Sequence, residues 1–143
     1  MRLCSIALVL LATPAGGEPD LTPAAQEERA LDILTRSVNF RSVEGDAALG
    51  AYADYLAGLL IKGGFARGDV EVDRSGPAPT LVATYQGKTD APPLLISGHL
   101  DVVAADPADW TRDPFSAVVE DGFVFGRGSY DNKFDVSMAV ATL

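Results

Sequence analysis

The stretch LLISGHLD, residues 94–101, decides the fold expected for this chain. Residues 94–96 are continuously apolar, which is typical of a central strand that is covered on both faces. The apolar run is followed by Ser-Gly-His-Leu-Asp at residues 97–101. Because open α/β sheets bind ligands at the carboxyl ends of their strands, the stretch predicts a buried strand that delivers His99 and Asp101 to a binding edge.

The patterns on either side of this stretch predict an α/β domain. Thr22-Pro23 is a helix start, and Gly63-Gly64 is a helix stop. Asp121-Gly122 is a strong signal for a two-residue hairpin turn. Helices are expected over 22–38 and 46–63 and from 131 to 143, strands over 70–73, 80–85 and 94–96, and a hairpin over 117–125.

His99 is the only histidine in the sequence, and Asp101 follows it at the second position. In extended backbone both side chains point to the same side. The carboxylate can then accept a hydrogen bond from one imidazole nitrogen and leave the other nitrogen for a metal ion. The alternative is a structural histidine whose hydrogen bonds are satisfied within the fold, and this pair alone does not decide between them.

The segment GRGSYDNK, residues 126–133, places two glycines and Asp131 before the last predicted helix. Glycines permit a tight backbone that brings the aspartate toward the strand ends. Asp131 has a simpler reading as a helix N-cap, since carboxylates are favoured at helix N-termini. A phosphate-binding loop is disfavoured because the third glycine and the Lys-Ser/Thr pair are missing.

Three motifs together resemble the M20 metallopeptidases. They are GHLDVV at 98–103, WTRDPF at 110–115 and GRGSYDNK at 126–133, in matching order and spacing. The resemblance covers nearly all of the chain after residue 17. One departure is visible at Phe134 and Asp135, where the family commonly has glycine, and it affects none of the expected ligands.

The resemblance implies a site with two zinc ions, for which His99 ligates one ion and Asp131 bridges both. It places Asp101 in the catalytic centre as the residue that orients His99 and tunes the site. It also implies a cis peptide bond at Asp131-Asn132. Trp110 and Arg127 are expected to support loops, and no chemistry is assigned to them.

By the same resemblance, the fold is an incomplete three-layer α/β/α catalytic domain with a mixed, mostly parallel sheet. The longer parent protein would hydrolyse the amide bonds of peptides or N-acyl amino acids, as a carboxypeptidase or a deacylase. The family's remaining zinc ligands, its general-base glutamate and its dimerisation domain are not found in these residues. The truncated chain is therefore expected to be inactive, while the parent is compatible with a homodimer.

The first 17 residues have the layout of a secretory signal peptide, with a basic start, an apolar run over 3–12 and small residues after it. The apolar run is shorter than the ~20 residues of a membrane-spanning helix. We therefore expect a secreted or periplasmic protein whose mature domain covers 18–143 and has no membrane segment. The only cysteine, Cys4, would be lost on cleavage.

Composition excludes some classes of function. A hydrophobic fraction of 48% with 22% charged residues is typical of a globular protein. The net charge of -9 disfavours binding to nucleic acid. Two alternatives to an enzyme remain: a non-catalytic, peptidase-like binding protein and a nucleotide-binding α/β domain, the latter disfavoured by the incomplete glycine motif.

Overall fold

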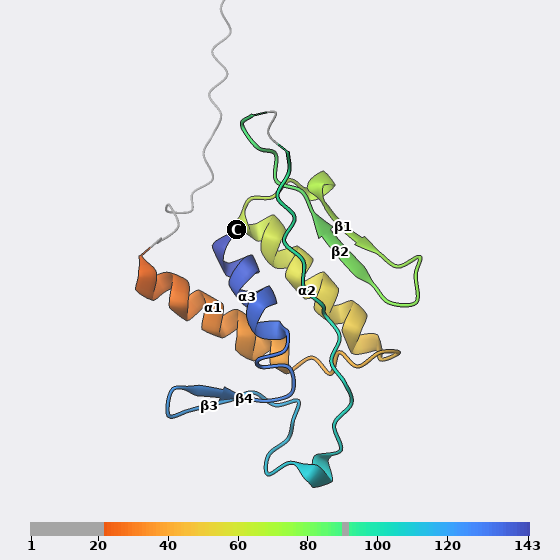
Figure 1. Cartoon of the computed structure of the whole chain (residues 1–143), viewed down its shortest axis with the longest axis vertical. Helices are drawn as coiled ribbons and strands as arrows, with labels where there is room; N and C mark the ends of the chain where they lie inside the picture. The colour runs from red at the N-terminus through yellow and green to blue at the C-terminus, as the bar shows by residue number, and fades with distance from the viewer. Residues whose placement is uncertain (1–21, 90–91) are drawn as a thin grey trace, which may run out of the picture.

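The computed structural model describes residues 22–89 and 92–143, in which helices and short hairpins are joined by extended segments (Figure 1). The α-helices are α1 (Pro23–Val38), α2 (Ala47–Gly63) and α3 (Lys133–Thr142). The strands are β1 (Val70–Asp73), β2 (Thr80–Ala83), β3 (Val118–Glu120) and β4 (Phe123–Phe125). The short 3-10 turn η1 (Arg67–Asp69) precedes β1. A second 3-10 turn, η2 (Pro107–Asp109), follows the extended segment at residues 92–101.

The ends of α1 and α2 follow from the residues that flank them. The Thr22 side chain accepts a hydrogen bond from the Ala25 N–H and caps α1, with proline at the first helical position. Asp46 caps α2 by accepting from the Ala48 N–H. Gly64 ends α2 in the left-handed conformation, with φ of 116°. These helix boundaries agree with the sequence prediction.

The core lies where the three helices meet. In Figure 1, α3 lies between α1 and α2, and α3 makes most of its contacts with α1. Ile33 from α1, Tyr52 and Leu56 from α2 and Ala141 from α3 form one buried apolar cluster. The β1–β2 hairpin packs against α2. The helices therefore supply one another's apolar cover.

Both sheets in the described residues are antiparallel pairs. β1 pairs with β2 so that Val70 lies opposite Ala83, and β3 pairs with β4 so that Val118 lies opposite Phe125. The second turn has positive φ at Asp121 and Gly122, 52° and 80°, as a type I′ turn requires. The predicted hairpin over 117–125 is thereby confirmed.

The predicted strand at residues 94–96 is wrong for the structure described. These residues are extended but unpaired, and Leu94 and Leu95 are 87% and 86% exposed. A strand needs a neighbour for its N–H and C=O groups, and no described strand pairs with these residues. The only parallel pairing within 22–89 and 92–143 is the isolated bridge between Val43 and Val102. The described residues thus form an α/β fold without the expected parallel sheet or complete third layer.

No helix in the described part of the chain is long and apolar enough to cross a membrane. The expected signal peptide at 1–17 lies outside the described residues.

Candidate metal centre

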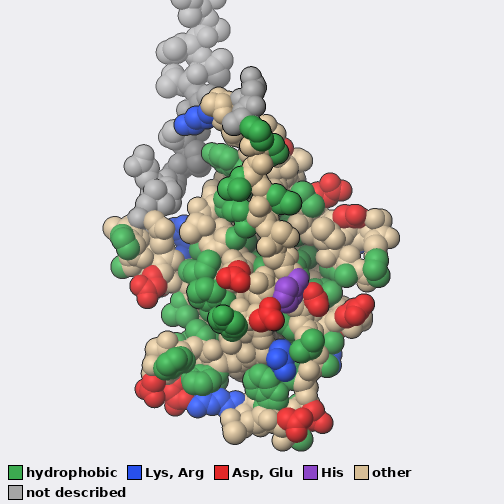
Figure 2. All heavy atoms as spheres, in the orientation of Figure 1, with side chains coloured by type: hydrophobic (Ala, Val, Ile, Leu, Met, Phe, Trp, Pro, Cys, Tyr) green, Lys and Arg blue, Asp and Glu red, His purple; other side chains and the backbone are tan. Residues whose placement is uncertain are grey.

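His99 and Asp131 come together from parts of the chain 32 residues apart. The His99 Nε2 atom lies 2.9 Å from a carboxylate oxygen of Asp131. The Nδ1 atom of the same ring lies 2.9 Å from the backbone carbonyl oxygen of Asp101 and 3.5 Å from its carboxylate. Figure 2 shows the single histidine among acidic side chains on one face of the molecule. The structure therefore brings all three predicted site residues to one place.

Two contacts position the extended segment that carries His99. The Val102 N–H donates to the Ser42 carbonyl at 2.9 Å, which fixes the segment to the loop between α1 and α2. At Gly98, an added Cβ atom would lie 2.7 Å from Asn132 Oδ1 and 3.0 Å from Val136 Cγ2. Glycine at position 98 thus allows the segment to approach the start of α3 closely enough for His99 to reach Asp131.

A buried lysine anchors the loop that carries Asp131. Lys133 has no solvent exposure, and its ammonium donates to the carbonyl oxygens of Ser37 and Phe40, each at 2.7 Å. The same ammonium lies 5.0 Å from the centre of the Tyr52 ring. The Lys133 N–H donates to the Gly128 carbonyl and closes the loop. Lys133 therefore ties the Asp131 loop to the C-terminal end of α1, where carbonyls lack helical partners.

Both ring nitrogens of His99 face oxygen acceptors. A carbonyl oxygen can only accept, so Nδ1 must carry a proton toward Asp101. Nε2 then faces the Asp131 carboxylate, which favours a second proton or a cation on that nitrogen. The hydrogen bond with Asp131 accordingly raises the pKa of His99 above its ordinary value of 6.5, and the contacts with Asp101 act in the same direction while burial opposes them.

The structure changes two details of the site expected from the sequence. Asp101 contacts His99 mainly through its backbone carbonyl, because its carboxylate lies farther from the ring. Asp131 does not cap α3, since Asn132 occupies the N-cap position and the Asp131 carboxylate contacts His99. The N-cap reading of Asp131 is therefore wrong. The peptide bond Asp131-Asn132 is cis, as predicted.

The donor atoms suit part of a zinc site. Imidazole nitrogen and carboxylate oxygen are both common zinc ligands, and two ligands of one tetrahedral zinc lie about 3.3 Å apart. The observed 2.9 Å between His99 Nε2 and Asp131 would need only a small opening to admit an ion. Among the described residues, no group of three or more His, Cys, Asp or Glu side chains could hold a metal. His99 and Asp131 thus fit the ion but leave its other positions to further ligands.

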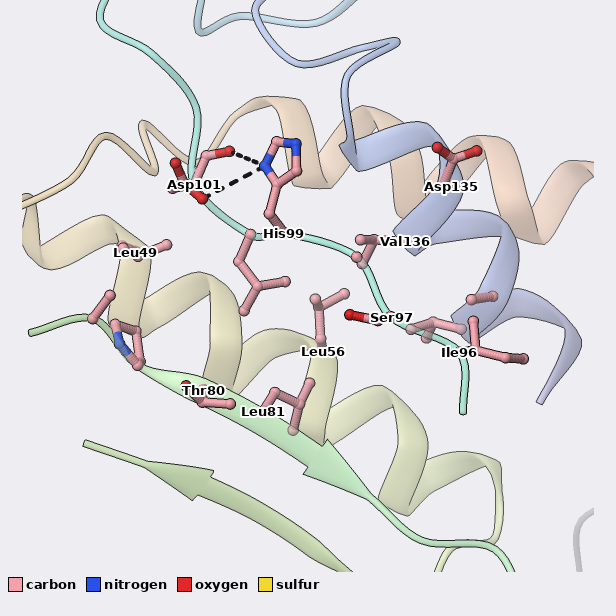
Figure 3. Close-up of a pocket in the computed structure, with 16 residues that line it drawn as sticks. Leu49, Leu56, Thr80, Leu81, Ile96, Ser97, His99, Asp101, Asp135 and Val136 are labelled. Carbon is pink, nitrogen blue, oxygen red and sulfur yellow. Dashed lines mark hydrogen bonds and ion pairs between the residues drawn. The ribbon is translucent and has the colours of Figure 1, made fainter. Parts of the chain in front are cut away.

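Two hollows adjoin His99. The larger, about 370 Å³, lies between α2, β2, the extended segment and α3, and apolar side chains such as Leu56, Leu81 and Ile96 line it (Figure 3). In Figure 3 the His99 ring stands at its rim, turned toward Asp101. The smaller hollow, about 330 Å³, is lined by His99, Asp101 and Asp131 and by the glycine-containing loop at 126–130.

Comparison with known proteins agrees with this geometry. Residues 95–143 match the sequence profile of Peptidase family M20/M25/M40. Over this segment the chain is similar to the M20 metallopeptidases. It is 43% identical over 96 residues to a succinyl-diaminopimelate desuccinylase of Methylobacterium sp. (strain 4-46), covering 62% of this chain and 23% of that protein. It is 39% identical over 93 residues to succinyl-diaminopimelate desuccinylase 2 of Ruegeria sp. (strain TM1040), covering 64% and 23%.

A solved structure shares the fold of this chain. Human carnosine dipeptidase 1 superposes with a TM-score of 0.63 at 23% sequence identity, over 83% of this chain and 29% of that chain. The chain spans about a quarter of the length of the curated relatives described above.

Sequence reasoning missed the structural part played by Lys133, the last residue of the motif at 126–133, and the unpaired charge of Arg127. Nothing in the sequence marks Lys133 as buried, because a lysine early in a helix usually reaches solvent. Arg127 was expected to support a loop, and its guanidinium does lie 5.0 Å from the centre of the Trp110 ring. Its charge, however, has no partner in the residues described.

Proposed function

We propose that this chain forms part of the catalytic domain of a longer, zinc-dependent M20 enzyme that hydrolyses amide bonds in peptides or N-acyl amino acids. The observation that carries the proposal is the pair formed by His99 and Asp131, with the second nitrogen of His99 held by Asp101. The match of residues 95–143 to a family of peptidases supports the reaction class. Assays with dipeptides and with N-acyl amino acids distinguish a carboxypeptidase from a deacylase.

Each residue has a defined task in this proposal. His99 would offer Nε2 to a zinc ion, and Asp131 would offer its carboxylate to the metal site. The Asp101 carbonyl accepts the Nδ1 proton, which fixes the tautomer that leaves Nε2 free. When bound, zinc would polarise the scissile carbonyl and acidify a water molecule. Lys133 holds the loop that presents Asp131.

The 143-residue chain alone is proposed to be inactive. Two donors leave a tetrahedral zinc half ligated, and no glutamate lines either hollow in the described residues, so the general-base glutamate that the family resemblance implies is not among them. In the longer protein we propose that residues 94–98 pair within a mostly parallel sheet of a three-layer domain. The apolar lining between β2 and Ile96 supports this.

Hydrolysis tests the proposal directly. The 143-residue chain and the longer protein are assayed with dipeptides and N-acyl amino acids at fixed Zn²⁺. We expect turnover only by the longer protein, with loss on chelation and in the His99→Ala variant. A longer protein that binds such compounds but never cleaves them would favour the second candidate, a non-catalytic binding protein. Turnover by the 143-residue chain that disappears in His99→Ala would contradict the proposed inactivity.

Export is a separate proposal. The layout of residues 1–17 supports cleavage near residues 15–17, a secreted or periplasmic location and a mature domain that starts near Glu18. Sequencing the N-terminus of the exported protein tests it, and an intact Met1 would reject it.

A further inference from the structure

Tyr130 places a phenol ring at the small hollow of the candidate metal centre. The residue is 85% exposed and lines the hollow of about 330 Å³ together with His99 and Asp131. Within residues 22–89 and 92–143 its hydroxyl makes no hydrogen bond, and its ring stacks on no other ring or cation. An aromatic ring carries a large apolar surface whose removal from water is favourable. Tyr130 thus offers a free apolar face beside the two expected metal ligands.

The loop that presents Tyr130 is closed by hydrogen bonds on both sides of this residue. The Ser129 N–H donates to the Gly126 carbonyl at 3.2 Å, and the Lys133 N–H donates to the Gly128 carbonyl at 3.1 Å. The buried ammonium of Lys133 ties the same loop to the end of α1. A tyrosine side chain has only two main torsions to immobilise, so on such a loop it loses little freedom when a ligand packs against it.

The exposure of Tyr130 differs in kind from that of Leu94 and Leu95. Those leucines are exposed to a similar degree, but the backbone of residues 94–98 makes no hydrogen bond to another described backbone group. Such a segment needs a neighbouring strand, which would cover the leucines as well. The loop around Tyr130 is already closed, and a phenol suits a surface that meets both water and an apolar ligand.

The surroundings of the ring leave it free to meet a compound at the metal position. Tyr130 precedes Asp131, and consecutive Cα atoms lie only about 3.8 Å apart. A substituent a few bonds from an amide at His99 and Asp131 can therefore reach the ring. Val103, which is 70% exposed, lines the same hollow and adds aliphatic surface. Arg127 also lines it, but its guanidinium stacks on the Trp110 ring and leaves the Tyr130 ring unoccupied.

From these observations we propose that Tyr130 is a specificity-determining residue whose ring packs against an aromatic group next to the scissile amide. This inference rests on the proposed hydrolase function and names a substituent that the function leaves open. Aromatic pairs prefer offset-stacked or edge-to-face arrangements with ring centres about 4.5–7 Å apart. The preferred substrates thus carry a phenyl or benzyl group on one side of the amide.

Hydrolysis by the longer protein at fixed Zn²⁺ provides the first measurement. N-acetylphenylalanine and N-acetylalanine differ by a ring on the amine side of the amide, and N-benzoylglycine and N-acetylglycine differ by a ring on the acyl side. We expect kcat/KM to be at least fivefold higher for the aromatic member of one pair. The pair that shows this preference identifies the side of the amide that faces Tyr130. Equal kcat/KM within both pairs overturns the inference.

Variants assign the preference to this ring. Tyr130→Ala should lower the aromatic-to-aliphatic ratio of kcat/KM at least threefold, Tyr130→Phe should retain the ratio, and Tyr130→Leu should retain part of it. Phe123→Ala is the matched control, since Phe123 is 66% exposed and lines neither hollow. A ratio that Tyr130→Ala leaves unchanged, or that Phe123→Ala lowers equally, contradicts the proposed contact.

Thermal unfolding of the longer protein tests whether a ligand or the protein itself covers the ring. A ring that faces a ligand is exposed in the free enzyme, so Tyr130→Ala should change Tm by no more than about 2 °C. A loss of stability as large as that of Leu56→Ala would mean that other residues of the longer protein bury Tyr130, and the inference would be rejected.

Calorimetric binding of the same four compounds keeps the two proposals distinguishable. Hydrolysis of both members of each pair at equal kcat/KM rejects only the inference. Tighter binding of an aromatic compound that is lost in Tyr130→Ala, without hydrolysis of any compound, retains the aromatic contact and rejects the hydrolase. Equal binding within both pairs and no hydrolysis reject both.

Discussion

The helices and the extended segment at 92–101 bury their apolar side chains to opposite extents. Leu56 in α2 has no solvent exposure, whereas Leu95 is 86% exposed. A helix satisfies its backbone hydrogen bonds internally, so α1, α2 and α3 need only one another's side chains for cover. An extended segment must find a neighbouring strand for its backbone and cover for both faces. The residues of the candidate metal centre lie at the boundary, with His99 on the extended segment and Asp131 on a loop held by the helices.

The largest expected loss of stability comes from adding a methyl group at Gly126, where the loop before Asp131 packs against α1. Gly126 has φ of 151°, and an added Cβ atom would lie 2.3 Å from Val38 Cγ1 in α1. Gly126→Ala combines a strained backbone with overpacking, which together cost about 2–6 kcal/mol. We expect chemical denaturation to show a folded population that is strongly reduced or lost.

Gly58→Ala is the matched control for that substitution. Gly58 lies within α2, and no atom would come within 4 Å of its new Cβ. Because alanine is favoured over glycine in helix interiors, the variant should gain about 0.5–1 kcal/mol. Equal destabilisation by the two variants would contradict the packing described between Gly126 and Val38.

The comparison between the two regions is tested most directly with one pair of leucines. Leu56→Ala empties a fully buried position and should cost about 2–5 kcal/mol. Leu95→Ala should change the free energy of unfolding by no more than about 0.5 kcal/mol in the 143-residue chain. In the longer protein, the Leu95→Ala cost should rise toward that of Leu56→Ala if residues 94–98 become a covered strand. A large cost of Leu95→Ala in the 143-residue chain would show that the segment is already covered.

The sequence was most informative where structure depends on local chemistry. Thr22-Pro23, Asp46 and Gly64 act through atoms within a few residues, so the ends of α1 and α2 and the turn at Asp121-Gly122 could be predicted. The strand at 94–96 could not, because its pairing depends on a neighbour that the described residues do not provide. Convergence of His99 and Asp131 was predictable from the family motifs. The contact through the Asp101 backbone and the burial of Lys133 were not, since both depend on how the loop packs.

The third prediction concerns the tie between α1 and the Asp131 loop. Lys133→Met keeps a long side chain but removes the donor to the Ser37 and Phe40 carbonyls, which are then left without this partner. Both carbonyls keep a backbone donor, the Phe40 N–H for Ser37 and the Ser42 N–H for Phe40, so the variant loses only the hydrogen bonds from the charged ammonium. A hydrogen bond to a charged group contributes about 1.5–3 kcal/mol, and thermal or urea unfolding measures the loss. Lys62→Met, at a solvent-exposed lysine in the last turn of α2, is the control and should cost less than about 0.5 kcal/mol. Indistinguishable stabilities of the two variants would mean that Lys133 is not a structural tie.

Burial also lowers the pKa of Lys133 to about 8 from its ordinary 10.5. The unfolded chain then binds more protons than the folded chain between about pH 8 and 10.5, so this residue should make stability rise with pH across that interval. The rise should be absent in Lys133→Met.

The smallest expected effect is a change in the pKa of His99, the residue through which the extended segment contacts the Asp131 loop. As the only histidine, it gives a single set of imidazole signals in NMR spectra. Its pKa is raised chiefly by the hydrogen bond with Asp131. Asp131→Asn removes that ionised acceptor and should lower the His99 pKa toward 6.5. Asp101→Asn should lower it less, since the nearer Asp101 contact is a backbone carbonyl that the substitution retains.

The sign of the stability change follows from the direction of this shift. Because the folded state holds the His99 proton more tightly than the unfolded state, the stabilisation is fully present below about pH 6.5 and is lost as pH rises through the higher folded pKa. Asp131→Asn should therefore destabilise the chain slightly at pH 5 and hardly at all at pH 9. Titrations of His99 that coincide in the unaltered chain and in Asp131→Asn would mean that the extended segment and the helix-held loop do not meet in solution.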